Sequence, residues 1–283
     1  MEFDIFYHGN CPDGFGSALV AWLNYGEKAR YVPVFHNQKM PNIESKQVIF
    51  LDFCYSEEVM LHIAQNVEKL IIIDHHQGIH HILKNLEKLS NVQIFYDHHH
   101  SGAVLAWKYF YPHQPIPKLL SFIEDRDCHH NQLEEAKIPL LWLDTQPFVF
   151  SLWNSFLHFD DSIWKKIENF NQPMIKKFTS MINKAAQQSV NTILAGYPAK
   201  ICFGTEETAS DIAVKLAQSC KGIGIVLVLQ QNGSMKASLR TKEQIDLIPI
   251  AQKLGGNGHS YAAAFPCSLK MLDQLLNQQD IAS

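Results

Sequence analysis

Short apolar runs alternate with helix-like segments through the first half of the chain. The apolar runs predict strands at residues 3–7, 31–35, 48–51, 70–73 and 92–96. A loop is expected at residues 9–16 after the first strand. Helices are expected at residues 17–25, 57–66, 79–89 and 102–111. Strands that alternate with helices are typical of a mainly parallel sheet with helices on both faces. The first half of the chain is therefore expected to be an α/β domain.

A different pattern begins near residue 115. Strand signals become sparse up to residue 194, and apolar residues at three- and four-residue spacing suggest mostly helix there. Residues 174–194 are expected to form one long helix. Gly196 and Pro198 interrupt this pattern, and the Asn232-Gly233 dipeptide favours a hairpin turn between two later strands. The later strands are predicted at residues 199–203, 224–230 and 235–241. We therefore expect two domains, residues 1–194 and a smaller α/β domain at 195–283, with a cleft between them.

Composition narrows the classes of protein to consider. The chain has 283 residues, 46% of them hydrophobic, and a formal net charge of −4. No domain-wide basic surface is expected, which argues against binding of long duplex DNA. The six cysteines form no CxxC pair, no export signal is evident, and no apolar stretch is long enough to cross a membrane. These features predict a cytoplasmic protein without a membrane partner, and they leave open whether it forms a homodimer.

Acidic and imidazole side chains follow several of the apolar runs. They are His8 with Asp13, then Asp52, then Asp74-His75-His76, and last Asp125 with Asp127 after the run 119–123. One Asp after a strand is usually a helix cap or a turn residue. Groups that converge on one edge of a sheet need cations, because crowded carboxylates repel one another. Mixed carboxylate and imidazole ligands suit Mn²⁺, Mg²⁺, Fe²⁺ or Zn²⁺, and two such ions about 4 Å apart are a known arrangement for hydrolysing phosphate esters.

A second Asp-His-His sequence shows that this tripeptide alone is weak evidence for a metal site. Asp97-His98-His99-His100 also follows an apolar run in this chain, which has 15 histidines. We expect these histidines to be solvated loop residues. The segment 101–105 after them is rich in small residues and is expected to begin a helix.

The ordered set of motifs resembles the DHH phosphoesterase superfamily. Its first-domain motifs are HGNCPDGFGS at 8–17, the isolated Asp52, Asp74-His75-His76, and Asp125-Arg126-Asp127. In the second half, KASLRT at 236–241, GGNGH at 255–259 and AAA at 262–264 resemble the DHH-associated C-terminal domain, whose GGxGH motif closes over the substrate. The resemblance covers nearly the whole chain. The small-residue segment 101–105 also resembles a helix start that follows the DHH motif in this family and can lie beside the substrate.

The resemblance implies a role for each matching residue. It implies metal ligation by Asp13, Asp52, His75 and Asp125, with Asp52 and Asp125 as bridging candidates, and His8 lies near a ligand position of several branches. Asp74 would be part of the catalytic site, and His76 would stabilise the phosphate or protonate the leaving oxygen. The substrate phosphate would be held by Arg240, Gly255, Gly256, Gly258 and His259. Two divalent ions are implied, with manganese favoured and zinc or iron as alternatives.

One departure from the family pattern is plain. The first motif usually reads Asp-x-Asp-Gly, whereas this chain has Cys11-Pro12-Asp13-Gly14. Either a thiolate replaces one carboxylate ligand, which would favour Zn²⁺ or Fe²⁺, or one metal lacks that ligand. The choice between Asp125 and Asp127 is also open, because one of the two could pair with Arg126.

The prediction is thus a metal-dependent phosphohydrolase of the nanoRNase or oligoribonuclease type. It would cleave short oligonucleotides or small nucleotide and phosphate compounds by metal-activated hydroxide. The alternative is a nucleotide- or nucleic-acid-binding protein of the same fold, its catalysis weakened by Cys11. A zinc protein unrelated to phosphate chemistry rests only on the abundance of histidine.

Overall fold

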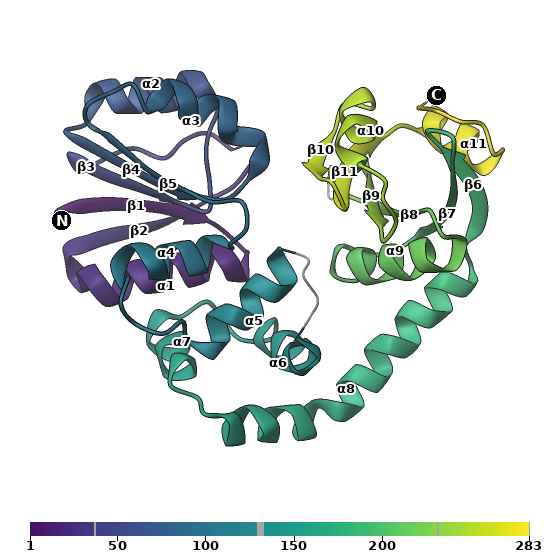
Figure 1. The fold of residues 1–283 in the computed structure, drawn as a ribbon, viewed down its shortest axis with the longest axis horizontal. Helices are drawn as coiled ribbons and strands as arrows, with labels where there is room; N and C mark the ends of the chain where they lie inside the picture. Colours follow the sequence, from purple (N-terminus) through teal and green to yellow (C-terminus); the bar gives the residue numbers. More distant parts are fainter. Residues whose placement is uncertain (37, 129–132, 231, 283) are drawn as a thin grey trace. The chain divides into compact units, whose positions relative to one another are not determined.

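The computed structural model describes residues 1–36, 38–128, 133–230 and 232–282 (Figure 1). The chain divides into two compact units, Met1–Gln172 and Pro173–Ser283. Short 3-10 turns occur at Gly26–Lys28, Gln77–Ile79 and Glu134–Ala136.

The first unit is built on a five-stranded parallel sheet in the order β2-β1-β3-β4-β5. Its strands are β1 (Phe3–His8), β2 (Ala29–Val34), β3 (Gln47–Leu51), β4 (Lys69–Asp74) and β5 (Val92–Tyr96). All five were predicted, because central strands buried on both faces are continuous apolar runs. The α/β fold class is therefore confirmed.

Helices cover both faces of this sheet. Figure 1 shows α1 (Pro12–Tyr25) and α4 (Gly102–Phe110) on one face, with α2 (Glu57–Asn66) and α3 (His80–Leu86) on the other. Alternate strand residues serve the two layers: Ile5 and Ile71 pack towards α1 and α4, and Phe6 and Ile72 pack towards α2 and α3. Polar residues lie at the carboxyl ends of the central strands.

Helix α1 begins earlier than the sequence predicts. The loop expected at 9–16 is wrong, because the helix starts at Pro12, a residue suited to the first helical position. The chain turns sharply just before, at Asn10 with φ 54°. The turn brings α1 against the end of β1 so closely that a Cβ on Gly14 would lie 2.2 Å from the His8 carbonyl oxygen. This contact places Asp13, in the first turn of α1, next to the strand ends.

The helical region after β5 forms an aromatic cluster. It contains α5 (Lys118–Asp127), α6 (Lys137–Leu143) and α7 (Phe150–Leu157). The fully buried Trp153 packs on Phe15 of α1. The apolar run 119–123 thus belongs to a helix, and the expectation that it ends at the sheet edge with the other runs is wrong.

Helix α8 (Asp161–Gln187) belongs to both units. Trp164 of its first half packs in the first unit, and Ile182 of its second half packs in the second. The long helix predicted at 174–194 is wrong at both ends: α8 starts at Asp161, and residues 190–194 form β6. Since β6 pairs with β7, the second sheet starts upstream of residue 195, where the sequence places the boundary.

The second unit contains a six-stranded mixed sheet in the order β10-β11-β9-β8-β7-β6. Its strands are β6 (Val190–Leu194), β7 (Tyr197–Phe203), β8 (Ile223–Leu229), β9 (Met235–Thr241), β10 (Asn257–His259) and β11 (Ala262–Cys267). Helix α9 (Glu206–Cys220) packs on one face, and α10 (Leu247–Lys253) and α11 (Leu269–Leu276) pack on the other. The predicted hairpin between β8 and β9 is confirmed by their antiparallel pairing and by Gly233, with φ 81°.

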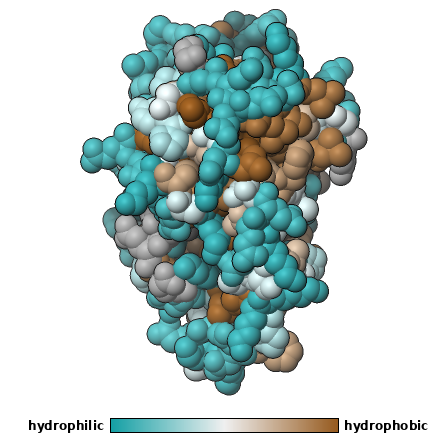
Figure 2. Space-filling model, turned by 90° about the vertical axis from the view of Figure 1, so that its right-hand side faces the viewer, coloured by the Kyte–Doolittle hydropathy of each residue, from teal (hydrophilic) through white to brown (hydrophobic). Residues whose placement is uncertain are grey.

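In Figure 2, hydrophobic surface gathers at the upper right of the view, and most of the remaining surface is hydrophilic. Among the described residues, no helix combines the length and apolar character needed to cross a membrane.

A buried carboxylate in β1 ties the first strand to the loop before β3. Asp4 is fully buried and accepts hydrogen bonds from Arg30 Nε at 2.8 Å and Arg30 Nη2 at 3.0 Å. The backbone N–H groups of Glu44 and Ser45 also donate to it. Burial favours the protonated carboxyl, but these bonds outweigh it and lower the pKa of Asp4.

Replacing Asp4 by Asn is therefore expected to destabilise the protein by about 3 kcal/mol, because it leaves Arg30 without its buried partner. The lowered pKa means that the stabilisation exists above the unfolded pKa of about 3.9 and is lost as pH falls through the folded value. Urea unfolding of both proteins at pH 7 and at pH 3 should show the difference shrinking in acid. Glu44→Gln is the matched control: Glu44 also pairs with Arg30, but it is 65% exposed, so its loss should cost less than about 1 kcal/mol. Equal effects of the two substitutions would contradict this account.

Candidate metal centre

Three neighbouring strands deliver polar side chains to one edge of the first sheet. His8 ends β1, Asp52 directly follows β3, and Asp74 ends β4. Because β1, β3 and β4 are adjacent and parallel, these positions lie side by side. Asp52 has a positive φ of 55°, and its N–H donates to the Ile73 carbonyl at 2.9 Å. The turn thus holds the Asp52 side chain between its neighbours.

His75 lies at the centre of the cluster. Its Nε2 is 3.2 Å from Asp52 Oδ1, 3.4 Å from Asp127 Oδ2 and 3.7 Å from Asp13 Oδ2. Asp13, Asp52 and His75 are buried, and Asp127 is partly exposed. The structure therefore brings together carboxylates from α1, the β3 turn and α5 around one imidazole.

The start of α4 fixes Asp13. The Gly102 N–H donates to Asp13 Oδ2 at 2.7 Å, and the Ala103 N–H donates to Oδ1 at 2.9 Å. Helix N-termini favour negative charge. A Cβ on Gly102 would lie 2.7 Å from the Asp52 Cβ and 3.0 Å from Asp13 Oδ2, so only glycine fits here without displacement. The run of small residues at 101–105 was the sequence signal for this contact, although Gly102 was not predicted as a site residue.

Asp74 positions His76. Asp74 Oδ1 accepts the backbone N–H groups of His75 at 2.6 Å and His76 at 2.9 Å, and it lies 2.8 Å from His76 Nδ1. Burial lowers the pKa of His76, but the Asp74 carboxylate outweighs it and raises that pKa to about 9. His76 Nδ1 also lies 3.8 Å from Asp52 Oδ1. The two residues predicted to be catalytic are thus coupled to each other beside the cluster.

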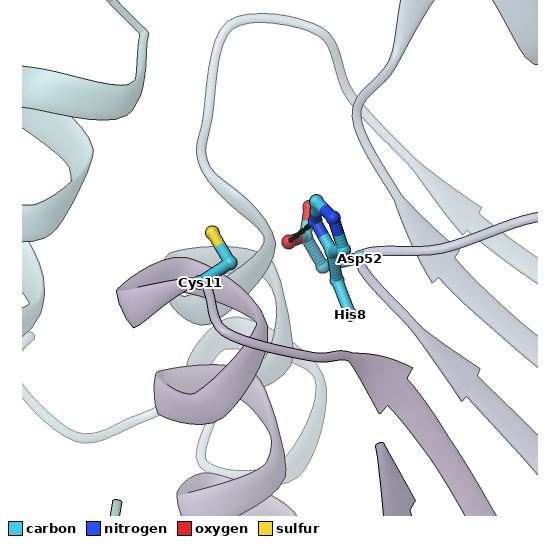
Figure 3. A group of neighbouring side chains, drawn as sticks. All are labelled: His8, Cys11 and Asp52. Carbon is cyan, nitrogen blue, oxygen red and sulfur yellow. Dashed lines mark ion pairs between the residues drawn. The ribbon is translucent and has the colours of Figure 1, made fainter. Parts of the chain in front are cut away.

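His8 and Cys11 also lie near Asp52. Figure 3 shows His8 at the end of β1, Cys11 at the start of α1 and Asp52 after β3, with an ion pair between His8 and Asp52. His8 Nδ1 is 3.4 Å from Asp52 Oδ2. One ligand atom from each of the three residues lies within 4.8 Å of the other two. His8 therefore lies where the sequence expects a ligand, and Cys11 lies with it.

The structure separates Asp125 from Asp127. Both are on α5, where residues two apart point about 200° apart around the helix axis. Asp127 contacts His75, whereas Asp125 is buried and accepts a hydrogen bond from the Leu133 N–H at 3.3 Å. The prediction of Asp125 as a ligand is not tested by these contacts, but Asp127 is the residue that they bring to His75. Cys128, which sequence reasoning missed, also hydrogen-bonds His75 and forms a group with His75 and Asp127.

The charges of this cluster call for a cation. Burial raises the pKa of Asp13 well above its ordinary value, and the carboxylates of Asp52 and Asp127 raise it further. Burial also raises the pKa of Asp127. For Asp52 burial acts in the same direction, but hydrogen bonds with His75 and His8 outweigh it and lower the pKa. The carboxylates of Asp13, Asp52 and Asp127 thus share a site around the imidazole of His75.

The donor set fits divalent ions. Carboxylate, imidazole and thiol atoms from separate elements form groups of three whose ligand atoms lie within 4.8 Å of one another, and divalent metals bind such donors. Asp74 Oδ2 is also buried without a hydrogen-bond partner among the described residues. A buried unpaired carboxylate oxygen is costly unless a cation or donor faces it. We conclude that these residues can hold one or two metal ions.

In the second Asp-His-His sequence, His98 and His99 are exposed as expected, whereas His100 is partly buried. Asp97, His98 and His99 form a group of their own, but His98 and His99 are exposed, and exposed groups of this kind are common without a metal. The His99 N–H donates to Asp97 at 2.9 Å, which is an ordinary turn contact. His100 lies instead against Glu124, with its Nδ1 3.0 Å from Glu124 Oε2.

In the second unit, Arg240 and His259 lie in one row across three strands. Ala262 pairs with Arg240 on one side and with His259 on the other. Residues directly opposite in antiparallel strands face the same side of a sheet, and the small Ala262 lies between the two long side chains. Arg240 Nε donates to Ser210 Oγ of α9 at 3.1 Å, and burial lowers the pKa of Arg240 to about 10.

Backbone geometry explains the glycines before this row. Gly255 has φ 80°, in the left-handed region that favours glycine. A Cβ on Gly256 would lie 1.9 Å from the Ala264 carbonyl oxygen, and one on Gly258 would lie 2.4 Å from the Ala263 Cα. These glycines therefore let the chain turn from α10 into β10 close against β11. A phosphate-binding role for them remains a prediction.

Fold and site together define a two-unit α/β protein with an acidic, imidazole-rich centre at the edge of a parallel sheet. No protein-family model matches the chain. It is 27% identical over 292 residues to the uncharacterized protein R106 of Acanthamoeba polyphaga mimivirus, an alignment covering 93% of this chain and 67% of that protein.

Three solved structures share the fold at 12–13% identity. An exopolyphosphatase-related protein from Bacteroides fragilis has a TM-score of 0.54, covering 97% of this chain and 91% of its own. RecJ from Thermus thermophilus, in complex with Mn²⁺, has a TM-score of 0.52, covering 98% of this chain but 51% of RecJ. The pGpG-specific phosphodiesterase PggH from Vibrio cholerae has a TM-score of 0.50, covering 98% and 97%.

Proposed function

We propose that this protein is a metal-dependent phosphohydrolase that cleaves phosphoester bonds of short oligonucleotides or small nucleotide and phosphate compounds. The observation that carries the proposal is the convergence of Asp13, Asp52, Asp127 and His75 at the carboxyl edge of the parallel sheet. Open α/β sheets bind their ligands at that edge. Solved proteins of this fold include one named as a phosphodiesterase and one in complex with Mn²⁺.

In this proposal each residue of the centre has a separate task. Asp13, Asp52, Asp127 and His75 would hold the divalent ions, and Asp52 is the carboxylate that contacts both His8 and His75. His8 is proposed as a further metal ligand beside Asp52. The ions, when bound, would neutralise the carboxylates, attract the phosphate and lower the pKa of water to near neutrality. Asp127 takes the place that the sequence assigns to Asp125.

His76 is proposed to protonate the leaving oxygen. Asp74 accepts from its backbone N–H and contacts its Nδ1, which fixes the ring orientation and favours the protonated form. A positively charged imidazole can both attract the phosphate and donate a proton as the ester bond breaks. Asp74 acts here through His76, as a positioning residue.

The second unit is proposed to bind the substrate. Arg240 and His259 share a row, and a guanidinium can hold phosphate oxygens in a bidentate manner. The net charge of −4 does not favour long duplex DNA, so a short or small substrate is proposed. The function assigned to each domain, the cytoplasmic location and homodimer formation stay predictions.

The test is hydrolysis by the purified full-length chain after metal removal and reloading. Substrates should include pGpG, another short oligonucleotide, 3′,5′-bisphosphoadenosine, polyphosphate and a chromogenic phosphodiester, each with Mn²⁺, Zn²⁺, Fe²⁺ or Co²⁺. We expect turnover of at least one nucleotide substrate, lost on chelation and restored by metal. Binding of nucleotide without turnover under every metal would contradict the proposal and favour the alternative of a catalytically weakened binding protein.

A further inference from the structure

Two groups of metal-binding side chains in the first unit have the same composition. One contains His8, Cys11 and Asp52, and the other contains His75, Asp127 and Cys128. Each offers one imidazole, one thiol and one carboxylate, with the ligand atoms of a group within 4.8 Å of one another. Carboxylates and imidazoles are expected in this fold, but a thiol in each group is a property of this chain.

The two groups adjoin. His75 Nε2 of one lies 3.2 Å from Asp52 Oδ1 of the other. The members come from separate elements: the end of β1, the start of α1, the turns after β3 and β4, and the end of α5. Cys11 and Cys128 each lie at a helix end, the first before α1 and the second after α5. The chain therefore brings one thiol into each of two groups that are joined by the Asp52–His75 contact.

The other four cysteines have different surroundings. Cys202 and Cys267 are buried in the second unit, and Cys220 Sγ donates to backbone carbonyls there. Cys54 lies near the sheet edge, but its Sγ donates to the Tyr55 carbonyl at 3.3 Å. Among the described residues, Cys11 and Cys128 are the cysteines found in a metal-binding group. Cys54 therefore serves as a control thiol from the same unit.

We propose that each of the two metal positions is bound through one cysteine thiolate, Cys11 in one and Cys128 in the other, so that this centre takes zinc or ferrous iron in preference to manganese or magnesium. Thiolates are soft ligands that select Zn²⁺ and Fe²⁺ over the oxygen-seeking Mn²⁺ and Mg²⁺. This inference rests on the proposed function only for the number of ions, and it departs from the preference for manganese that the family resemblance implies. It assigns to Cys128 a role that the sequence did not suggest.

Cobalt provides the direct test, because a Co²⁺–thiolate bond gives a near-ultraviolet charge-transfer absorption that carboxylate and imidazole ligands do not give. Co²⁺ is titrated into the metal-free full-length protein, and the spectrum is recorded. We expect the charge-transfer band to grow with each of two equivalents. Cys11→Ser and Cys128→Ser should each remove about half of its intensity, and Cys54→Ser should leave it unchanged. Co²⁺ binding without the band in the wild-type protein would overturn the inference, and this outcome needs no variant to fold.

Metal preference provides the second measurement. Competition titrations of Zn²⁺ against Mn²⁺ should show that Cys11→Asp, which restores the usual carboxylate, lowers the preference for Zn²⁺ by at least about tenfold. An unchanged preference would contradict a thiolate ligand at position 11. Turnover is scored separately: hydrolysis without a charge-transfer band would refute the thiolate ligands alone. The band without hydrolysis would support them and refute the phosphohydrolase.

Discussion

Replacing Asp52 by Asn is expected to lower the rate of phosphodiester hydrolysis by at least about 10³-fold, because the substitution removes the carboxylate that joins the two halves of the metal centre. Asp52 contacts His8 through Oδ2 and His75 through Oδ1. An amide has the same shape, but it lacks the negative charge that holds cations. The loss should appear in turnover and also in metal content, with fewer than two equivalents of divalent ion retained after dialysis.

Asn is the informative replacement at this position. Asp52 has φ 55°, a conformation that Asn tolerates much better than Ala or β-branched residues do. The folded backbone should therefore persist, and circular dichroism should match the wild-type spectrum. Asp97→Asn is the matched control, since Asp97 also directly follows a strand but lies in a turn with the exposed His98 and His99. Activity of the Asp52 variant within tenfold of wild type would remove Asp52 from the metal centre.

The position of a site residue could be predicted from the sequence where that residue directly follows a strand. Asp52, Asp74 and His75 could be predicted to converge because buried parallel strands are continuous apolar runs and their carboxyl ends share one edge. Hydrophobic pattern alone therefore located most of the centre. The hydrophobic pattern does not set these residues apart from Asp97, which also follows an apolar run, and the other motifs were needed for that distinction.

The contribution of α5 could not be predicted in the same way. The run 119–123 is apolar enough for a strand, and in a strand Asp125 and Asp127 would point to the same face. In the helix that forms, they point to different sides, and Asp127 meets His75. Cys128 was missed for a related reason: its approach to His75 depends on how α5 ends, and no spacing rule in the sequence describes that contact.

The division of the chain was limited by a helix that serves two cores. An amphipathic pattern shows that α8 buries one face, but not that its first half packs on the first unit and its second half on the other. The short strand β6 adds to the difficulty. Of its residues, Val190 and Ile193 are exposed, so its apolar positions suggested a continuing helix. Pairing with β7, a tertiary contact, decides the structure of this segment.

Replacing His76 by Gln is expected to slow hydrolysis of a dinucleotide by about 10²- to 10⁴-fold, the range found for loss of a general acid or base. The dinucleotide has a poor leaving group, an alkoxide that must be protonated as the bond breaks. A nitrophenyl phosphodiester has a good leaving group that needs no proton. If His76 donates the proton, the variant should therefore be impaired much less on the nitrophenyl substrate. The measurement is kcat for both substrates in both proteins.

The dependence on the leaving group separates proton donation from metal binding. Loss of an ion would slow both substrates equally, as expected for Asp52→Asn, whereas loss of the proton donor slows mainly the dinucleotide. Asp74→Asn should show the same selectivity with a smaller loss, because Asp74 orients the ring and keeps it protonated through its contact with Nδ1. His62→Gln, an exposed histidine of α2, is the control and should leave both rates unchanged. Equal slowing of both substrates by His76→Gln would show that His76 holds metal or phosphate and that the proton comes from another group.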